Sequence, residues 1–347
     1  CLAERKYAYE LEGRSVKKKD QERLIKHYKK TILGDKQVHS HVLQVATSDL
    51  DEAMKKFFKK VKNKKKGEKA GYPRFKSASR FHSFGFKEHG NGFKIDGNRL
   101  KITGVGRIPI RMHRPLPEGA IIKTIRVIHQ AGKWFVAIVI NKPASEDLPK
   151  TGRYVGIDVG ISSLITTSDG EKIDNPKYYQ QSQRKLRRVQ RALARKKKGS
   201  RNYKKNIRQL QRVHGHIADQ RSDFLHKLST YLVQQYDGIV LEDLRIKNMV
   251  KNRHLSKNIL DSGWGILRNY LTYKAVSANR ELLIINPANT SRCCSTCGCE
   301  FEGFSLSVRW VECQHCGLSL DRDHNAAINI LKKGRWDAPV LVNVGGK

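Results

Sequence analysis

The stretch RYVGIDVGISSLITTSDG, residues 153–170, predicts a buried apolar strand, a glycine turn and a second strand that ends at Asp169-Gly170. The first strand carries a carboxylate, Asp158, directly after Val-Gly-Ile. A second apolar strand, DGIVLEDL (237–244), carries Glu242 in the same way. A carboxylate is costly to bury unless it is paired or bound to a metal. The chain as a whole is strongly basic, so we expect a functional role for each acid that stands in an apolar strand.

A third acid, Asp323, stands at the start of the last expected helix, DRDHNAAINILKK (321–333). Three converging carboxylates suit two Mg²⁺ ions, which activate a water molecule and stabilise the leaving oxygen in phosphodiester cleavage. The residues alone leave alternatives open. Asp321 competes with Asp323 as a metal ligand, and Asp323 alone fits an N-terminal helix cap equally well. Asp243 competes with Glu242, although strand alternation puts these two on opposite faces.

Six of the seven cysteines lie between residues 293 and 316. Two Cys-x2-Cys pairs separated by fifteen residues have the spacing of a structural zinc site, and the expected ligands are Cys294, Cys297, Cys313 and Cys316. A disulfide framework is the weaker interpretation, because the rest of the chain offers no further cysteine pairs. Cys293 and Cys299 are left over beside better-spaced neighbours. Thiolates held on zinc indicate a reducing, intracellular environment.

The charge balance indicates a polyanionic partner. The chain has 69 Lys plus Arg against 32 Asp plus Glu in 347 residues, a formal net charge of +37. Nucleic acid is the usual polyanion that neutralises such a chain. No stretch approaches the ~18 apolar residues of a membrane span, and we expect no signal peptide. A basic structural RNA-binding protein shares this charge, but it does not need carboxylates on apolar strands.

The cations concentrate in two segments. Between Lys177 and Arg212 there are fifteen Lys or Arg and no acid, on two expected helices joined by KKKGS (196–200). The run 55–66 holds eight lysines in twelve residues, for which a solvated helix end is the alternative to a phosphate-binding face. The expected nucleic-acid contacts in these segments are Lys59, Lys60, Arg187, Arg188, Arg191, Arg195, Lys204 and Arg208.

The hydrophobic period divides the chain into regions. Helical spacing dominates residues 1–62, whereas from Gly71 onward apolar and polar residues alternate, which predicts a small antiparallel barrel. A polar, proline-bounded linker follows at 143–150, and a mixed region of strands and helices comes after it. The turns expected within the barrel are Asn91-Gly92, Asp96-Gly97 and Ala131-Gly132.

Taken in order, GIDVG, VLEDL, SGWG, NTSRCCSTCG and CQHCG…DRDHNAAINI resemble the RuvC-type nuclease of the transposon-encoded TnpB family, which is related to the compact type V CRISPR effectors. GYPRFKS and HRPLPEG resemble the barrel region of this family, and CLAERKYAYE resembles its early helical region. The resemblance thus spans essentially the whole chain. It implies a multidomain α+β fold, in which a helical recognition lobe inserted in an OB-like antiparallel wedge barrel precedes an RNase-H-like (RuvC) α/β domain with an inserted zinc ribbon.

The resemblance also assigns residues. It makes Asp158, Glu242 and Asp323 the catalytic, magnesium-binding triad and makes Cys294, Cys297, Cys313 and Cys316 the zinc ligands. The family's opening segment, which supplies part of the wedge barrel, is expected to be missing before Cys1, and Cys293 is an additional thiol. The expected domains are the recognition lobe (1–66), the wedge barrel (67–142), the linker (143–150), the nuclease domain with its basic hairpin (151–289), the zinc ribbon (290–320), and the final nuclease helix with the C-terminal tail (321–347).

The function that the resemblance implies is RNA-guided cleavage of DNA. We expect a guide RNA derived from the transposon end, which directs Mg²⁺-dependent hydrolysis of double-stranded target DNA beside a short flanking motif. The expected setting is a prokaryotic cytoplasm, close to the nucleoid, with a monomer or a dimer bound to one RNA. Two rival hypotheses are a guide-directed DNA-binding protein without cleavage, which has no need of all three acids, and a transposase, which the zinc ribbon before the last acid does not favour.

One helix is a candidate for reading the flanking motif. Val38, Val42 and Val45 give it an apolar face, which directs Ser40, His41 and Gln44 toward a different side. Gln can pair with adenine through two hydrogen bonds in the major groove, and Ser or His can add single ones. The alternative is an ordinary solvated polar face.

Overall fold

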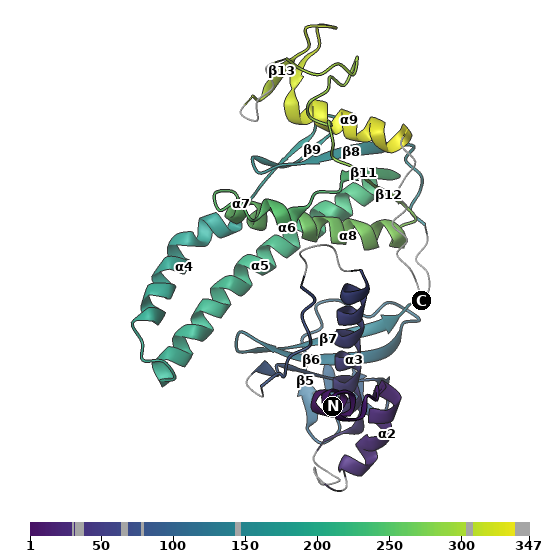
Figure 1. Cartoon of the computed structure of the whole chain (residues 1–347), viewed down its shortest axis with the longest axis vertical. Coiled ribbons are helices and arrows are strands. Elements are labelled where there is room, and N and C mark those ends of the chain that lie inside the picture. Colours follow the sequence, from purple (N-terminus) through teal and green to yellow (C-terminus); the bar gives the residue numbers. More distant parts are fainter. Residues whose placement is uncertain are drawn as a thin grey trace. The chain divides into compact units, whose positions relative to one another are not determined.

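The computed structural model describes residues 1–29, 31, 38–63, 69–77, 80–142, 147–302 and 308–336. The chain has a mixed α+β fold with several sheets (Figure 1). It divides into two compact units, residues 1–144 and 145–347, and this division falls within the expected linker. Lys64, Lys65 and Lys66 of the lysine run and the tail after Trp336 lie outside the described residues. Within the described ranges, every helix is too short or too polar to cross a membrane.

The first unit joins a helical segment to two small sheets. Its described elements are α1 (Leu2–Glu12), α2 (Lys18–Tyr28), α3 (Ser40–Lys62), β1 (Ser83–Phe86), β2 (Glu88–His89), β3 (Gly92–Asp96), β4 (Arg99–Ile102), β5 (Gly106–Pro109), β6 (Ile121–Gln130) and β7 (Lys133–Asn141). The described residues confirm helices within 1–62 and strands after Gly71, although Val38 precedes α3 and Ile32 lies outside the described residues.

The strands of this unit form two sheets around one core. The sheet orders are β1-β6-β7 and β2-β3-β4-β5, so the described strands do not close into one continuous ring of hydrogen-bonded pairs. The shared core consists of Phe86, Phe93, Leu100, Ile102, Ile125 and Val127. Alternation along each strand correctly predicts these buried positions, but it carries no information on which strands pair with which.

Two of the three expected hairpin turns are confirmed. Gln130 pairs with Lys133 across Ala131-Gly132, whose φ angles of 53° and 79° suit a two-residue hairpin turn, and Asp96 pairs with Arg99 across a turn that begins at Gly97. The hairpin expected at Asn91-Gly92 is wrong, because β2 and β3 pair in parallel there. Gly90 and Gly92 both have positive φ, which lets the chain form a tight loop that brings β3 alongside β2 in the parallel direction.

The second unit is built on a five-stranded sheet. Its described elements are β8 (Tyr154–Val159), β9 (Ser163–Thr167), β10 (Lys172–Asp174), α4 (Tyr178–Ala194), α5 (Arg201–Gln235), β11 (Gly238–Glu242), α6 (Ile246–Met249), α7 (Ser256–Ser262), α8 (Trp264–Ser277), β12 (Glu281–Ile285), β13 (Trp310–Glu312), β14 (Ser319–Asp321) and α9 (Arg322–Trp336). The strand order is β10-β9-β8-β11-β12, with β8, β11 and β12 parallel to one another and β9 and β10 added by antiparallel pairing.

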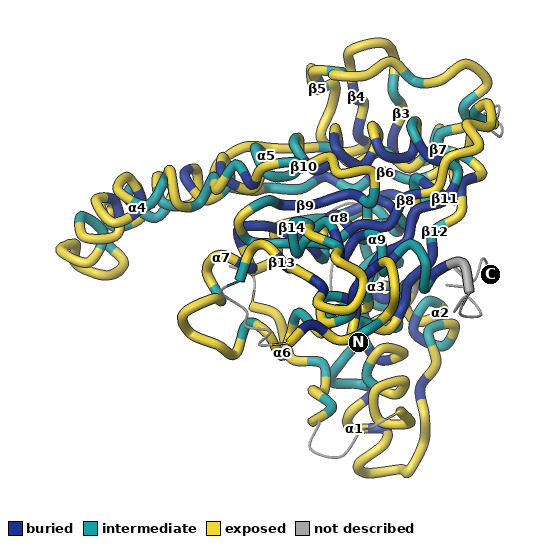
Figure 2. The backbone as a smooth tube through the Cα atoms, turned by 90° about the horizontal axis from the view of Figure 1, so that it is seen from above, coloured by how far each residue is buried: buried dark blue, intermediate teal, exposed yellow. Residues whose placement is uncertain are grey.

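The sheet is covered on both faces. Val155, Ile157, Ile239 and Leu241 share a core with apolar residues of α5 and α8. Val240 and its neighbours on β12 pack instead with Ile330 of α9, so α9 lies on the opposite face (Figure 1). Burial on both faces explains why these central strands are continuous apolar runs, and Figure 2 shows β8 and β11 largely in the colour of buried residues.

Helices α4 and α5 form the expected basic hairpin. The chain turns through KKKGS (196–200), where Gly199 has a φ of 87° and the Ser200 hydroxyl caps α5 by accepting from the Tyr203 N–H at 3.1 Å. Leu186 and Val189 of α4 pack against Val213 and Ile217 of α5. This apolar seam leaves the basic residues on the outer faces of the hairpin.

Candidate active site

The two strand carboxylates lie side by side at one end of the sheet. Asp158 is near the carboxyl end of β8, and Glu242 is the last residue of β11. In the parallel register Ile157 faces Leu241, so Asp158 and Glu242 occupy the next positions on neighbouring strands, which run about 4.8 Å apart. Each acid lies two residues beyond a position that contacts α9, Gly156 and Val240 respectively. Both side chains therefore point to the face that α9 covers.

Helix α9 brings the third carboxylate to the same face. It packs on β8 at Gly156, where a Cβ atom would overlap the carbonyl oxygen of Ala327 and lie 2.5 Å from the nitrogen of Leu331. Only glycine permits this backbone-to-backbone approach. Asp323 precedes Ala327 by one helical turn and so shares its side of the helix.

The electrostatics of the three acids agree with this placement. Burial, the charge of Glu242 and the charge of Asp323 together raise the pKa of Asp158 well above its ordinary value. Burial also raises the pKa of Glu242, against the opposing effects of the Thr290 hydroxyl, which donates to its carboxylate at 2.5 Å, and of Lys333. Asp323 forms ion pairs with Arg322 at 3.0 Å and with Arg309 at 3.4 Å. Partly buried carboxylate oxygens, among which the charge of Asp158 is disfavoured by its two neighbours, are the donor set that a hard divalent cation such as Mg²⁺ binds.

The acids that compete in the sequence have other contacts. Asp243 is exposed and pairs with Arg268 of α8 at 2.6 Å, on the face opposite α9. Asp321 accepts hydrogen bonds from the backbone N–H groups of Asp323 and His324, both at 3.1 Å, and pairs with Lys172 at 2.7 Å. Asp321 therefore caps α9, which leaves Asp323 in the first turn and free of that role. The geometry favours Glu242 and Asp323 as the partners of Asp158.

The two Cys-x2-Cys pairs converge on one point. The sulfur atoms of Cys294, Cys297, Cys313 and Cys316 all lie within 4.8 Å of one another. The pairs Cys294–Cys316 and Cys297–Cys313 are each 3.5 Å apart, which is too far for a disulfide bond, and all seven cysteines are free thiols. Four sulfur donors at these separations form a cluster suited to a single zinc ion. Cys293 and Cys299 are not members of this cluster.

Hydrogen bonds shift the pKa values of two thiols of the four-cysteine cluster in opposite directions. The backbone N–H of Cys316, with help from that of His315, lowers the pKa of the Cys313 thiol to about 6. The backbone N–H of Leu318 acts in the same direction on Cys316, but burial and hydrogen bonding with the three neighbouring thiols raise the pKa of Cys316 to about 12. A zinc ion bound to these four sulfurs would displace their protons, because the thiolate is the form that binds metal.

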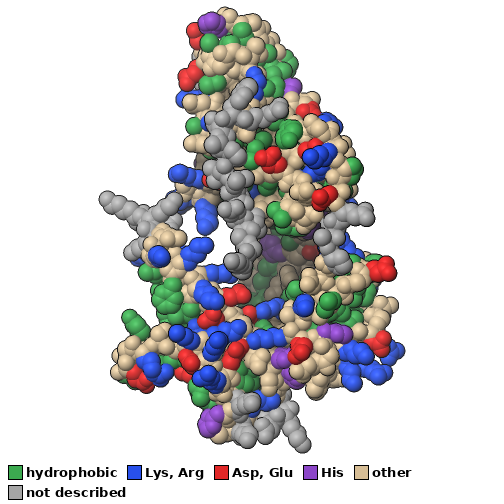
Figure 3. Space-filling view, turned by 90° about the vertical axis from the view of Figure 1, so that its right-hand side faces the viewer, with side chains coloured by type: hydrophobic (Ala, Val, Ile, Leu, Met, Phe, Trp, Pro, Cys, Tyr) green, Lys and Arg blue, Asp and Glu red, His purple; other side chains and the backbone are tan. Residues whose placement is uncertain are grey.

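The predicted phosphate contacts on the hairpin are exposed. Arg187, Arg188 and Arg191 of α4, Arg195 at its carboxyl end, and Lys204 and Arg208 of α5 all face solvent. Within the described chain, none of the fifteen Lys and Arg residues between 177 and 212 forms an ion pair with a carboxylate, and Figure 2 shows the outer faces of α4 and α5 as exposed. Basic side chains also occur elsewhere on the surface, as one face shows in Figure 3.

The candidate motif-reading helix differs from the expectation. Lys59 and Lys60 are exposed on the last turns of α3, but His41 is buried, with its ring 4.8 Å from that of His39. Helix α3 packs onto β1, where Val45 lies against Gly85, and His41 belongs to its buried residues. Ser40 and Gln44 are partly buried, so these residues do not form one open polar face.

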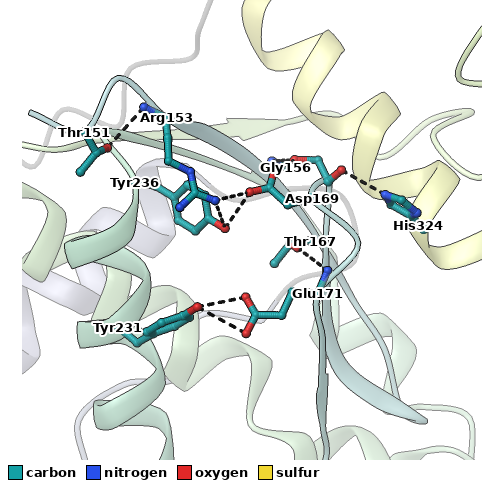
Figure 4. Close-up of polar contacts among 10 residues, drawn as sticks. Thr151, Arg153, Gly156, Thr167, Asp169, Glu171, Tyr231, Tyr236 and His324 are labelled. Carbon is teal, nitrogen blue, oxygen red and sulfur yellow. Dashed lines mark hydrogen bonds and ion pairs between the residues drawn. The ribbon is translucent and has the colours of Figure 1, made fainter.

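Sequence reasoning missed the polar contacts that hold α5 and α9 to the sheet edge (Figure 4). Asp169 in the β9–β10 turn accepts from Arg153 at 2.6 Å and from the Tyr236 hydroxyl at 3.0 Å, while His324 of α9 contacts the Ser168 carbonyl oxygen at 3.1 Å. Burial and the hydrogen bond to Asp169 raise the pKa of Tyr236 to about 12. The partners lie far apart in the sequence, so periodicity gave no signal for them.

Carboxylates that converge beneath a helix, a four-sulfur cluster and an uncompensated basic hairpin are together typical of a metal-dependent protein that acts on nucleic acid. Residues 137–253 match the family model described as probable transposase (OrfB of IS605), and residues 264–330 match the Cas12f1-like TNB domain. The chain belongs to the TnpB family.

Relatives of known name support this membership. A Streptomyces pristinaespiralis protein named as an RNA-guided DNA endonuclease is 40% identical over 300 residues, which cover 86% of this chain and 72% of the relative. In Escherichia coli (strain K12), InsQ, which is named in the same way, is 33% identical over 310 residues, covering 85% and 74% respectively. A solved CRISPR-Cas12f ternary complex is similar with a TM-score of 0.42 and 16% identity over 95% of this chain and 78% of that one, and the family assignment does not rest on it.

Proposed function

We propose that this protein is an RNA-guided DNA endonuclease that carries a transposon-derived guide RNA and hydrolyses double-stranded DNA beside a short flanking motif. The observation that carries the proposal is the convergence of Asp158, Glu242 and Asp323, because a buried carboxylate whose charge is disfavoured by two neighbouring acids is costly unless a cation binds there. Membership of a family whose relatives are named as RNA-guided DNA endonucleases supports the choice of substrate.

The chain's own residues supply the parts of this chemistry. Asp158, Glu242 and Asp323 are the proposed Mg²⁺ ligands, and bound Mg²⁺ would activate water and stabilise the leaving oxygen. The Thr290 hydroxyl fixes the orientation of the Glu242 carboxylate, and Arg322 and Arg309 hold that of Asp323. These contacts fix the oxygen atoms before any substrate arrives, as metal-assisted hydrolysis requires.

The finer architecture belongs to the same proposal. We assign residues 1–66 to a recognition lobe, 67–142 to an OB-like wedge domain and 151–347 to a RuvC-like nuclease interrupted by a zinc ribbon at 290–320. One structural Zn²⁺ on the four-cysteine cluster would hold the ribbon together. The hairpin α4–α5 would track the phosphates of the guide–target duplex, while base pairing selects the sequence.

The test compares two neighbouring acids. Asp158→Ala is expected to abolish cleavage of a guide-matched plasmid in Mg²⁺ while the protein keeps its bound RNA and its affinity for the target, because the carboxylate contributes nothing to base pairing. Asp243→Ala is the matched control, since Asp243 is exposed and pairs with Arg268 on the other face. It should cleave normally.

Two outcomes would contradict the proposal. If the Asp158→Ala variant still linearises the plasmid, Asp158 is not needed for cleavage. Sequencing the nucleic acid bound to the purified protein tests the guide. If no discrete RNA with a variable 3′ segment is found, the guide-RNA part of the proposal is wrong.

A further inference from the structure

The four-cysteine cluster is joined to helix α9 by a buried amide. Asn325, which is 0% exposed, accepts a hydrogen bond from the backbone N–H of Ser295 at 2.8 Å and donates one to the carbonyl oxygen of Cys293 at 2.9 Å. Ser295 lies inside the Cys294-x2-Cys297 turn. Asn325 therefore holds the backbone around the first cysteine pair through both the oxygen and the nitrogen of its side-chain amide.

A second amide extends this contact toward Glu242. Asn329, one turn further along α9, donates to the same Cys293 carbonyl at 2.7 Å and to the carbonyl oxygen of Thr290 at 2.9 Å. The hydroxyl of Thr290 donates to the Glu242 carboxylate at 2.5 Å, and Thr290 is only 6% exposed. One chain of hydrogen bonds thus runs from the cysteine turn to a carboxylate on β11.

The other carboxylate partner is attached to the same helix. Asp323 stands two residues before Asn325 in the first turn of α9, and the backbone of α9 rests directly on Gly156 of β8. A buried asparagine that loses its partners leaves unsatisfied polar atoms, which costs about 1–3 kcal/mol per group. The first turn of α9 and the cysteine turn are therefore strongly favoured to keep one fixed relative position.

We propose that Asn325, Asn329 and Thr290 form a positioning relay, which makes the geometry of the carboxylate site depend on a metal-loaded four-cysteine cluster. The proposal rests on the proposed function, because it takes the three acids as metal ligands. The relay residues do not touch the reacting atoms. They act by fixing where Glu242 and Asp323 stand relative to Asp158, as groups that orient metal ligands do in other metal sites.

The relay is tested by metal binding without nucleic acid. Electron paramagnetic resonance of added Mn²⁺ measures the affinity of the carboxylate site, and elemental analysis of the same samples measures zinc. Thr290→Val, which removes the hydroxyl while preserving shape, is expected to weaken Mn²⁺ binding about 10- to 100-fold with zinc retained. Thr290→Ser keeps a hydroxyl and should restore the affinity. Asn325→Ala is expected to weaken Mn²⁺ binding by a similar factor.

Two further variants complete the design. Cys297→Ser changes no oxygen ligand, yet the relay predicts that it weakens Mn²⁺ binding too. Asn248→Ala replaces an exposed asparagine of α6 and should bind both metals as the unmodified protein does.

The outcomes separate the relay from the proposed function. If Asp158→Asn loses Mn²⁺ binding while Thr290→Val or Cys297→Ser binds it normally, the carboxylate site stands and the relay is wrong. If Asp158→Asn binds Mn²⁺ as tightly as the unmodified protein, the three acids are not the metal site, and the relay is overturned together with the proposed function. The Thr290 pair keeps the test decisive even if Asn325→Ala fails to fold.

Discussion

At the scale of single residues, the ionised carboxylate of Asp158 lowers the stability of the folded chain. Its pKa is raised by burial first and by Glu242 and Asp323 next, so its charged form is disfavoured in the folded chain. Below the ordinary carboxyl pKa, folded and unfolded chains both carry the proton. As pH rises above that value, the unfolded chain releases the proton first, so the contribution of Asp158 to stability falls until pH passes its raised pKa.

We therefore predict that Asp158→Asn stabilises the magnesium-free protein near neutral pH. The sign of the gain follows from the raised pKa, because Asn carries no charge that burial disfavours. Thermal unfolding in buffer without Mg²⁺ measures it. The difference from the unmodified protein should shrink toward pH 4, and added Mg²⁺ should raise the Tm of the unmodified protein only. Equal Tm values for the two proteins at pH 7 would contradict the assignment of Asp158 as a strained acid.

Gly156 gives a second prediction at this scale. Gly156→Ala places a Cβ against the backbone of Ala327 and Leu331, neither of which can move without displacing α9. We expect a loss of about 1–3 kcal/mol or more in the free energy of unfolding, measured by urea denaturation. Gly215→Ala is the matched control, because a Cβ there meets nothing within 4 Å and α5 favours alanine over glycine by up to about 1 kcal/mol. If both substitutions stabilise, the close packing of α9 on β8 is wrong.

At the scale of elements, the basic hairpin has the simplest testable role. Replacing Arg187, Arg188, Arg191 and Arg195 by Gln should weaken RNA binding and reduce the slope of log affinity against log salt. Each lost phosphate contact lowers that slope by about 0.7–0.9 units. The fourfold Arg→Lys variant keeps the charge and should keep the slope. A slope that the Gln variant leaves unchanged would make the hairpin a solvated surface.

The four-cysteine cluster can be tested by measuring the zinc content per chain. Cys297→Ser and Cys316→Ser should each reduce zinc below one per chain and lower the Tm, because binding energy at a structural zinc site is also folding energy. Cys299→Ser should retain both, since Cys299 lies outside the cluster. One zinc per chain in Cys297→Ser, found by elemental analysis, would refute the four-cysteine site.

Local sequence patterns predict the helices and strands, but they do not predict which of these elements pair or pack together. Strands β8 and β11, the hairpin α4–α5 and helix α9 follow from periodicity and turn residues, and the cysteine spacing anticipated the cluster of sulfurs. The pairing of strands into two sheets and the burial of His41 depend on packing between distant segments, which no local pattern encodes. The contact from Thr290 to Glu242 spans 48 residues, and the one from Ser295 to Asn325 spans 30. Such contacts are visible only once the chain is folded.

At the scale of the whole molecule, a net charge of +37 destabilises the chain by self-repulsion. We predict that the Tm of RNA-free protein rises with salt between about 50 and 500 mM, because screening shortens from roughly 14 to 4 Å over that range. Differential scanning fluorimetry measures this rise. The fourfold Arg→Gln hairpin variant should show a smaller rise. A Tm that falls or stays constant with salt would mean that ion pairing outweighs repulsion.

The position of α9 has a consequence for the order in which the protein becomes competent. Asp323 is encoded far downstream of Asp158, and the hairpin α4–α5 lies between them. During translation the hairpin emerges from the ribosome before either the cysteine pairs or the final carboxylate has been made. Under the proposed function, RNA binding by the hairpin would therefore precede assembly of the complete set of metal ligands, so the guide would be in place before the chain is able to cut.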